Sequence, residues 1–393
     1  MRHGMYLGMA LSILALAVGG PVRAEASADA PETKAPEAPE KKKIEFELRF
    51  MFWAVSAGPE DLPTGTPVPT AQTGNIQDFF LRRGRLILKA QASPRLDIYA
   101  QFGQDNAGSK ISRDDAGFRI KDLYLNYKRA DGLQVVLGQF KVPFLRQNLQ
   151  SDFELLLVDR SLLTSIRPAI EGSRDQGGMV WGNKGGFQYR AAVFDGADQE
   201  DNNPTSSLRG SARVSWNWFT PEKGLSYTST ALGEKRILQV GLQGDAQNHR
   251  LDSKDDTGFT AESRSYHAWA ADLFYDQPFA GRWVVTFEGA WVERRDDYDA
   301  PGVDTRSVSG YFAEAGLLLP WKIGPGRLQA SGRYEDQDTD RGPATSSISL
   351  RSAGITYYAA GHARKIQLDY TQRHERPIEL DNDEVRLSVI ASF

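Results

Sequence analysis

From Ile44 to the end of the sequence, hydrophobic and polar residues alternate with a period of two. In the first such stretch Ile44, Phe46, Leu48, Phe50 and Phe52 share one face, and the residues between them are mostly polar. This alternation is typical of β-strands with one apolar and one polar face. The pattern predicts sixteen strands, at 44–54, 77–91, 95–104, 117–129, 133–142, 173–182, 186–195, 208–219, 237–247, 265–277, 282–293, 307–319, 326–337, 347–360, 364–374 and 383–393.

The connections between these segments are of two alternating kinds. One kind is long, polar and rich in Gly, Asp, Asn or Pro, at 55–76, 105–116, 143–172, 196–207, 248–264, 294–306, 338–346 and 375–382. The other kind is a short turn, at 92–94, 130–132, 183–186, 278–281, 321–325 and 361–363. Long extracellular loops that alternate with short periplasmic turns are typical of outer-membrane β-barrels. The long connection at 220–236 breaks this rhythm, and we expect it to fold as a periplasmic extension.

A secreted β-sandwich or β-helix is the alternative to a barrel, and a sandwich could show the same alternation because it hides one apolar face of each strand. Two features favour the barrel. One is the loop rhythm, and the other is the aromatic Phe393 at the end of the last strand, which resembles the C-terminal signature of bacterial outer-membrane barrels. A closed barrel also leaves no backbone group unpaired in lipid. We therefore expect an all-β protein, a transmembrane antiparallel β-barrel of about 16 strands that spans 44–393.

The composition of the 393 residues agrees with this interpretation once the lumen is considered. Charged residues make up 25% of the chain and the formal net charge is −4, which argues against a general nucleic-acid partner. The chain has no Cys, which removes disulfides, iron–sulfur clusters and thiol nucleophiles. Mean hydropathy is −0.46, too low for a bundle of membrane helices. A barrel gives such a value because half of each strand faces water.

The first 43 residues predict export rather than structure. A basic start, an apolar run from Met5 to Val18 and the small-residue site Val22-Arg23-Ala24 form a secretory signal peptide, which we expect to be removed after Ala24. Residues 25–43 consist largely of Ala, Pro, Glu and Lys. Such a segment lacks the apolar content to pack, so we expect a disordered periplasmic tail.

Four motifs follow one another in the middle of the chain. They are GQFKVPF at 138–144, VDRSL at 158–162, SRDQGG at 173–178 and YRAAVFDG at 189–196. In this order they resemble the phosphate-selective porin O and P family. The resemblance implies a sixteen-stranded, trimeric outer-membrane porin whose long third extracellular loop folds into the lumen and narrows it.

In this chain the third long loop is 143–172. Its length of about thirty residues is unusual for a connection, and it carries the apolar runs 155–158 and 162–163. An apolar loop is expected to pack against something rather than extend into water. The lumen wall is one candidate surface, and a neighbouring subunit of a trimer is the other.

The charges that line a pore set its selectivity, together with its width. The predicted solute contacts are Lys141 and Arg146, beside the start of the loop, and the strand pairs Arg83 with Arg85 and Arg209 with Arg213. Arginine suits phosphate because its donors form a fork. Acidic residues at other lumen-facing positions give a mixed lumen, so the alternative is that these arginines pair with acids and only set a transverse field. Arg160 is expected to anchor the loop to the wall.

Rival functions find little support in the sequence. Metal-ligand spacing such as HExxH, a GxSxG elbow and a P-loop are all missing from the sequence, and Ser265 and His267 are the best pair for an embedded enzyme. A structural or adhesive barrel is the other alternative. We therefore expect a cofactor-free, non-enzymatic channel for small hydrophilic solutes, with anions such as phosphate among the candidates. Its expected partners are outer-membrane lipid and lipopolysaccharide, small ions and two further copies of the chain.

Overall fold

The structure is a computed structural model that describes residues 43–58, 75–111, 117–166, 173–196, 207–251, 263–279, 282–298, 306–341, 344–377, 380 and 382–393. The chain divides into a unit that ends at Lys43 and a unit from Ile44 to Phe393, and the second unit holds nearly all of the described residues. The predicted signal peptide and nearly all of the predicted tail lie outside the described residues, so both stay predictions. No helix in the described part of the chain is long and apolar enough to cross a membrane.

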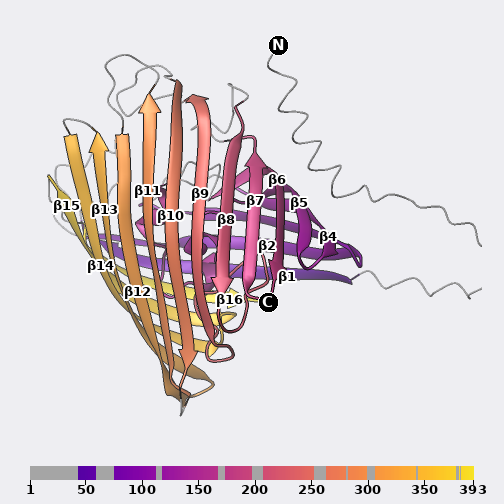
Figure 1. Cartoon of the computed structure of the whole chain (residues 1–393). Helices are drawn as coiled ribbons and strands as arrows, with labels where there is room; N and C mark the ends of the chain where they lie inside the picture. Colours follow the sequence, from indigo (N-terminus) through magenta and orange to yellow (C-terminus); the bar gives the residue numbers. More distant parts are fainter. Residues whose placement is uncertain are drawn as a thin grey trace, which may run out of the picture. The chain divides into compact units, whose positions relative to one another are not determined.

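Sixteen antiparallel strands form one closed barrel, as the alternation predicts (Figure 1). Each strand pairs with its neighbours in the chain, and β1 closes the ring against β16. The strands are β1 (Lys43–Ala57), β2 (Ile76–Ser93), β3 (Leu96–Ala107), β4 (Arg119–Ala130), β5 (Leu133–Lys141), β6 (Arg174–Lys184), β7 (Phe187–Phe194), β8 (Arg209–Asn217), β9 (Ile237–Leu251), β10 (Ser263–Pro278), β11 (Val284–Tyr298), β12 (Arg306–Ile323), β13 (Gly326–Arg341), β14 (Ala344–Ala360), β15 (Arg364–Arg376) and β16 (Glu384–Ser392).

The two faces of the wall are the reverse of those in a water-soluble protein. Large apolar side chains such as Leu242, Trp291 and Ile355 point outward and are exposed, whereas polar side chains such as Gln239 and Glu288 point inward and are buried. Outward apolar residues can remain exposed in this way because lipid, not water, surrounds a membrane barrel. The register of the strands therefore places most charged strand residues in the lumen.

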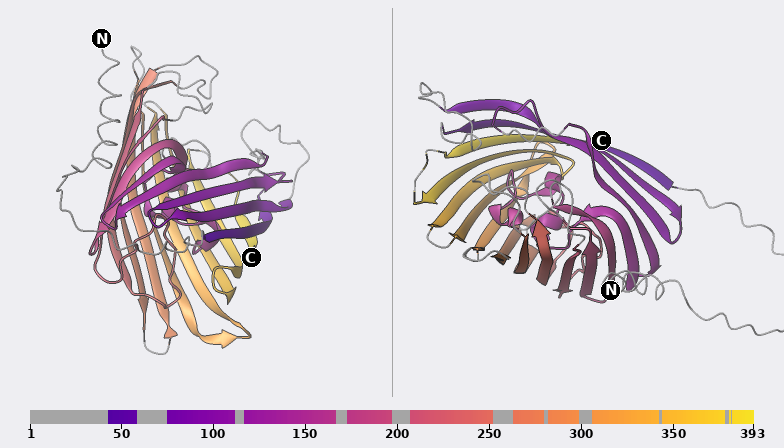
Figure 2. Two further views of the ribbon diagram at one scale, coloured as in Figure 1. Left: turned by 90° about the vertical axis from the view of Figure 1, so that its right-hand side faces the viewer. Right: turned by 90° about the horizontal axis from the view of Figure 1, so that it is seen from above.

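The third long loop folds inside this ring, which confirms the prediction. Seen from above, its short helical turns lie within the circle of strands (Figure 2). They are α2 (Arg146–Leu149), η1 (Asp152–Glu154) and η2 (Leu162–Ser165). Apolar loop residues pack on the inner wall: Phe144, Leu145 and Leu163 join a buried cluster with Val292 of β11 and Phe312 of β12. We call residues 142–166 the constriction loop; residues 167–172 lie outside the described part.

The connection between β8 and β9 corrects one expectation. We predicted a periplasmic extension at 220–236, but this segment turns into the barrel and meets the constriction loop. Tyr227 donates its backbone N–H to Leu149 O at 3.2 Å, and Ser229 donates to Glu154 O at 3.3 Å. The physical reason is that the wall offers polar partners to this segment, such as Asp276, which accepts from the N–H of Ala231 at 2.6 Å.

Candidate functional site in the barrel lumen

The wall holds the constriction loop by its backbone. Asp369 of β15 accepts the Val158 N–H at 3.0 Å, and Glu335 of β13 accepts the Leu162 N–H at 2.7 Å. Asp272 of β10 accepts the Arg146 N–H at 3.0 Å. Backbone groups satisfied in this way are expensive to release, because a buried donor without a partner costs about 1–3 kcal/mol. The loop is therefore fixed along an arc of the inner wall that runs from β10 to β15.

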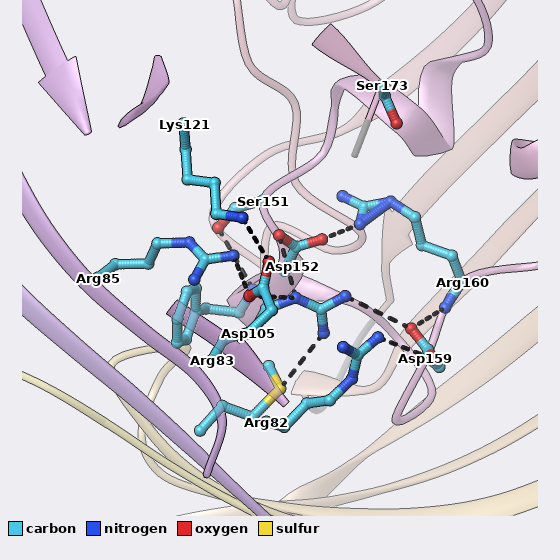
Figure 3. Close-up of polar contacts among 12 residues, drawn as sticks. Arg82, Arg83, Arg85, Asp105, Lys121, Ser151, Asp152, Asp159, Arg160 and Ser173 are labelled. Carbon is cyan, nitrogen blue, oxygen red and sulfur yellow. Dashed lines mark hydrogen bonds and ion pairs between the residues drawn. The ribbon is translucent and has the colours of Figure 1, made fainter. Parts of the chain in front are cut away.

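Opposite this arc, two loop carboxylates dock on a basic strip of the wall (Figure 3). Asp152 lies 3.4 Å from Nε of Arg83, and Asp159 lies 3.6 Å from Nη2 of Arg82 and 3.9 Å from Nη2 of Arg83. Arg160, on the loop itself, also pairs with Asp152. We call this group the arginine latch; its members are Arg82, Arg83, Arg85, Asp105, Lys121, Asp152, Asp159, Arg160 and Arg386.

The latch holds more positive than negative charge. Its six basic side chains face four carboxylates when Glu384, which pairs with Arg386, is counted with Asp105, Asp152 and Asp159. Asp105 of β3 binds Arg85 at 2.5 Å and Lys121 at 2.9 Å. Burial alone would raise the pKa of the Asp159 carboxyl, but Arg82, Arg83 and Arg386 outweigh it and lower this pKa to about 2. Burial likewise opposes ionisation of Asp152, yet Arg160 and Arg83 hold its pKa well below the usual range. Both carboxylates are therefore charged at neutral pH.

The β7–β12 side of the lumen is built differently, from charges that are sealed from water. Arg209 of β8 forms ion pairs with Asp245 at 3.0 Å and with Asp175 at 3.3 Å, and all three side chains are fully buried. Arg213 pairs with Asp272, both about 1% exposed. Arg146 lies between Glu222 at 2.8 Å and Glu288 at 3.3 Å and is also fully buried. These pairs fill this half of the lumen rather than line a path.

Water-accessible charges gather on the β1–β3 and β16 side. The exposed fraction of the side chain is 24% for Asp105, 23% for Asp159, 17% for Arg49, 16% for Arg82 and 15% for Arg386. On the opposite side the corresponding fractions are mostly 5% or less. The accessible part of the lumen therefore runs past the arginine latch.

The site residues predicted from the sequence are thus split between the latch side and the sealed side of the lumen. Arg83 and Arg85 belong to the latch, whereas Arg146, Arg209 and Arg213 belong to the sealed half. Lys141 ends β5 and donates to Gln150 O at 2.5 Å, which ties the start of the loop to its middle. Whether any of these residues contacts a solute stays a prediction.

Arg160 braces the loop rather than reaching the wall. Its side chain donates to Gln147 O at 3.1 Å and Gln150 O at 2.5 Å and pairs with Asp152, all within the loop. The wall meets it through its backbone instead, because Arg333 donates to Arg160 O at 3.3 Å.

Sequence reasoning missed Arg82 and Asp105 as members of the site. Strict alternation from Arg83 places Arg82 outside the barrel. The inward face of β2 changes parity, however, from Asp78 and Phe80 to Arg83 and Arg85. Arg82 consequently turns inward, where its guanidinium lies 4.6 Å from the ring of Trp53. Alternation alone gives no signal of this parity change, because two adjacent strand residues are expected to point to opposite faces.

The family is settled by a comparison with family models. The model described as phosphate-selective porin O and P matches residues 65–391, which is most of the chain. The chain belongs to this family. By membership and fold it is an outer-membrane porin, a channel-forming barrel. The family's name does not by itself establish that this member prefers phosphate.

Individual relatives are more distant. An uncharacterized protein of Aquifex aeolicus (strain VF5) is 24% identical over 319 residues, which cover 73% of this chain and 74% of that protein. Among solved structures, an anion-selective porin from Comamonas acidovorans has a TM-score of 0.58 at 10% identity and covers 90% of this chain and 100% of its own. The outer membrane channel DcaP of Acinetobacter baumannii has a TM-score of 0.56 at 14% identity, covering 91% and 99%. These two structures show the shared fold.

Proposed function

We propose that this porin lets small hydrophilic solutes diffuse passively past the arginine latch, with a weak preference for anions. The observation that carries the proposal is the excess of six basic over four acidic side chains in the latch and its partner Glu384, on the water-accessible side of the lumen. An excess of positive charge along a pore attracts anions and repels cations. The similarity to an anion-selective porin from Comamonas acidovorans agrees with this direction.

The preference is expected to be weak because the latch arginines are paired. Asp105, Asp152 and Asp159 already occupy donors of Arg82, Arg83 and Arg85. A phosphate ion would have to compete with these fixed carboxylates for the same guanidinium groups. Strong phosphate selectivity is therefore not expected from this geometry.

Solute contact in this proposal falls to the latch. Arg82, whose side chain is 16% exposed, and its buried neighbour Arg83 are the strongest candidates, and Arg85 acts through Asp105. Arg146, Arg209 and Arg213 are fully or almost fully buried and shape the field without touching a solute. Lys141 and Arg160 keep the loop in shape, which sets the width of the pore.

We also propose a homotrimer, as the family resemblance implies, and the strand lengths support a wall that is covered by another copy. β5, β7 and β8 have only nine, eight and nine residues, whereas β2 and β12 have 18 each. Eight residues at about 3.3 Å each, tilted by about 45°, rise only about 19 Å, less than the apolar band of about 25 Å. This low wall also exposes Gln176, which donates to Gln139 at 3.3 Å. A second copy of the chain would cover both the short wall and its polar groups.

Export by a signal peptide cleaved after Ala24 completes the proposal, and the barrel exterior would then face outer-membrane lipid and lipopolysaccharide. An embedded enzyme and an adhesin are not favoured, since family and fold are those of a channel. N-terminal sequencing of protein isolated from outer membranes tests the cleavage site. An N-terminus other than Glu25 would refute it.

Planar lipid bilayers test the channel itself. The purified protein is expected to give stepwise conductance, and its reversal potential in a KCl gradient is expected to lie modestly toward the chloride equilibrium potential. Marked cation selectivity would overturn the anion preference, and absence of conductance steps would overturn the proposal as a whole. Sedimentation in detergent tests the trimer, which a monomeric mass would refute.

A further inference from the structure

The inward segment Glu222–Thr228, between β8 and β9, covers a cluster of three arginines. Arg146 comes from the constriction loop, Arg190 from β7 and Arg213 from β8. The guanidinium carbons of these side chains lie 5.0, 4.9 and 5.8 Å from the centre of the Tyr227 ring. Three cations around one ring interact favourably with its electron-rich faces, which is the usual basis of cation–π contacts. We call Glu222–Thr228 the arginine cap.

The cap also supplies the acceptors that these arginines need. The Glu222 carboxylate accepts from Nη2 of Arg146 at 2.8 and 3.0 Å, and Thr228 O accepts from the same nitrogen at 3.0 Å. Gly224 O and Leu225 O each accept from Arg190 at 2.9 Å. The cap thus places a carboxylate, three carbonyls and a ring at the position where an oxyanion could otherwise bind the three arginines.

Arg190 has the strongest need for the cap. The described residues give it no carboxylate ion-pair partner. Its side chain interacts with Gln188, with two cap carbonyls and with Tyr227 of the cap. Within the described structure Nε of Arg146 and Nε of Arg213 also have no hydrogen-bond acceptor. The cluster therefore has cationic donor capacity that its wall partners, Asp272 and Glu288, do not fill.

We propose that the arginine cap is an internal competitor for anions, with Glu222 and Tyr227 occupying an oxyanion site formed by Arg146, Arg190 and Arg213. The cap keeps solutes on the latch side of the lumen and lowers the anion preference of the channel. This inference rests on the proposed channel function. If the inference holds, Glu222 and Tyr227 determine specificity, although the cap and the constriction loop enter the lumen from opposite ends of the barrel.

The decisive variant is Tyr227→Leu, because it removes the ring without changing any charge. We expect it to raise the chloride-to-potassium permeability ratio about twofold. This is the effect of bringing Arg190, to which the described residues give no carboxylate partner, within range of the pore. Inorganic phosphate is expected to block part of its chloride current, while the parent channel is not blocked. Adding Arg190→Gln to Tyr227→Leu should remove the block.

Phe140→Leu is the matched control, since Phe140 is another buried lumen aromatic, and the described structure places its ring against the rings of Tyr124 and Phe194. It should lose comparable packing and leave selectivity and phosphate response unchanged. If Tyr227→Leu does not insert into bilayers, Glu222→Gln replaces it with the same two readouts, because it keeps the shape of the side chain. A variant channel with the parental reversal potential and no phosphate block would overturn the inference. A parent protein that forms no channel would instead overturn the proposed function.

Discussion

Asp159→Asn is the most informative perturbation of the arginine latch. The carboxylate of Asp159 stands 3.6 Å from Arg82 and 3.9 Å from both Arg83 and Arg386, so its charge counters three arginines at once. Asparagine keeps the shape and the ability to accept hydrogen bonds but removes the charge. The positive excess of the latch and Glu384 then grows from two to three.

Two magnitudes can be worked out from this geometry. The pKa of Asp159 falls from 3.8 to about 2, a difference that corresponds to about 2 kcal/mol in favour of the folded, charged form. Because this pKa is lowered, the contribution is present above the unfolded value near 4 and is lost as the pH falls through about 2. An ion that passes about 7 Å from the carboxylate feels about 0.6 kcal/mol in a water-like medium, which salt at 0.1 M reduces by about half. Anions gain and cations lose this energy, so the permeability ratio should change about threefold.

The assay is the reversal potential of single channels in a KCl gradient at low ionic strength. Asp159→Asn is expected to shift it toward the chloride equilibrium potential and to make the open current noisier, since the loop loses an anchor. Asp297→Asn, the same change at a half-exposed site on the outer face of β11, is the control and should have no effect. Because the pKa of Asp159 is lowered to about 2, titration of this residue should not change the reversal potential of the parental channel between pH 7 and 5. An unchanged reversal potential in Asp159→Asn, with the barrel intact, would refute the placement of the water path beside the latch.

Three further outcomes test other parts of the barrel. Arg209→Gln should lower the free energy of unfolding in urea by about 3–5 kcal/mol, because Asp245 stays buried without its ion-pair partner. The reversal potential should not change, and a shift in selectivity would place Arg209 on the path of the ions. Glu335→Gln weakens the acceptor of the hydrogen bond from Ser161 Oγ, which is 2.6 Å long, and should lower the free energy of unfolding by about 2 kcal/mol. The open current should also become noisier, and openings without added noise would show that other contacts hold the loop. Leu242→Arg places a charge on the lipid face and should lower stability in vesicles by about 2–4 kcal/mol, which an unchanged unfolding curve would contradict.

The strands and their faces could be predicted from the sequence because a membrane barrel imposes one rule on every strand. Apolar residues must face lipid and polar residues the lumen, and closure leaves no strand without a partner. The structure extends several strands beyond the apolar pattern, for example β11 to Tyr298 where the sequence predicts an end near 293. Beyond the lipid the backbone ladder continues, while outward residues such as Glu293 and Arg295 become polar, so the sequence signal fades before the strand does.

The fate of individual arginines could not be predicted in the same way. Alternation correctly sends Arg83, Arg209 and Arg213 inward, but it cannot show which half of the lumen is filled. That depends on contacts between distant segments, such as Arg146 with Glu222 and Glu288, which lie 76 and 142 positions further along the chain. The segment at 220–236 has no apolar periodicity, so nothing in its pattern distinguishes a lumen cap from a solvated extension.

Burial, rather than composition, therefore decides what the formal charge of −4 means for this channel. Carboxylates that neutralise Arg209, Arg213 and Arg146 contribute to the acidic total but are sealed from water with their partners. An ion in the accessible lumen meets instead the side where the six basic groups of the latch face four acidic groups, Glu384 included. A net acidic chain can for this reason carry an anion-preferring path, and the strength of that preference depends on how firmly Asp152 and Asp159 hold the latch arginines.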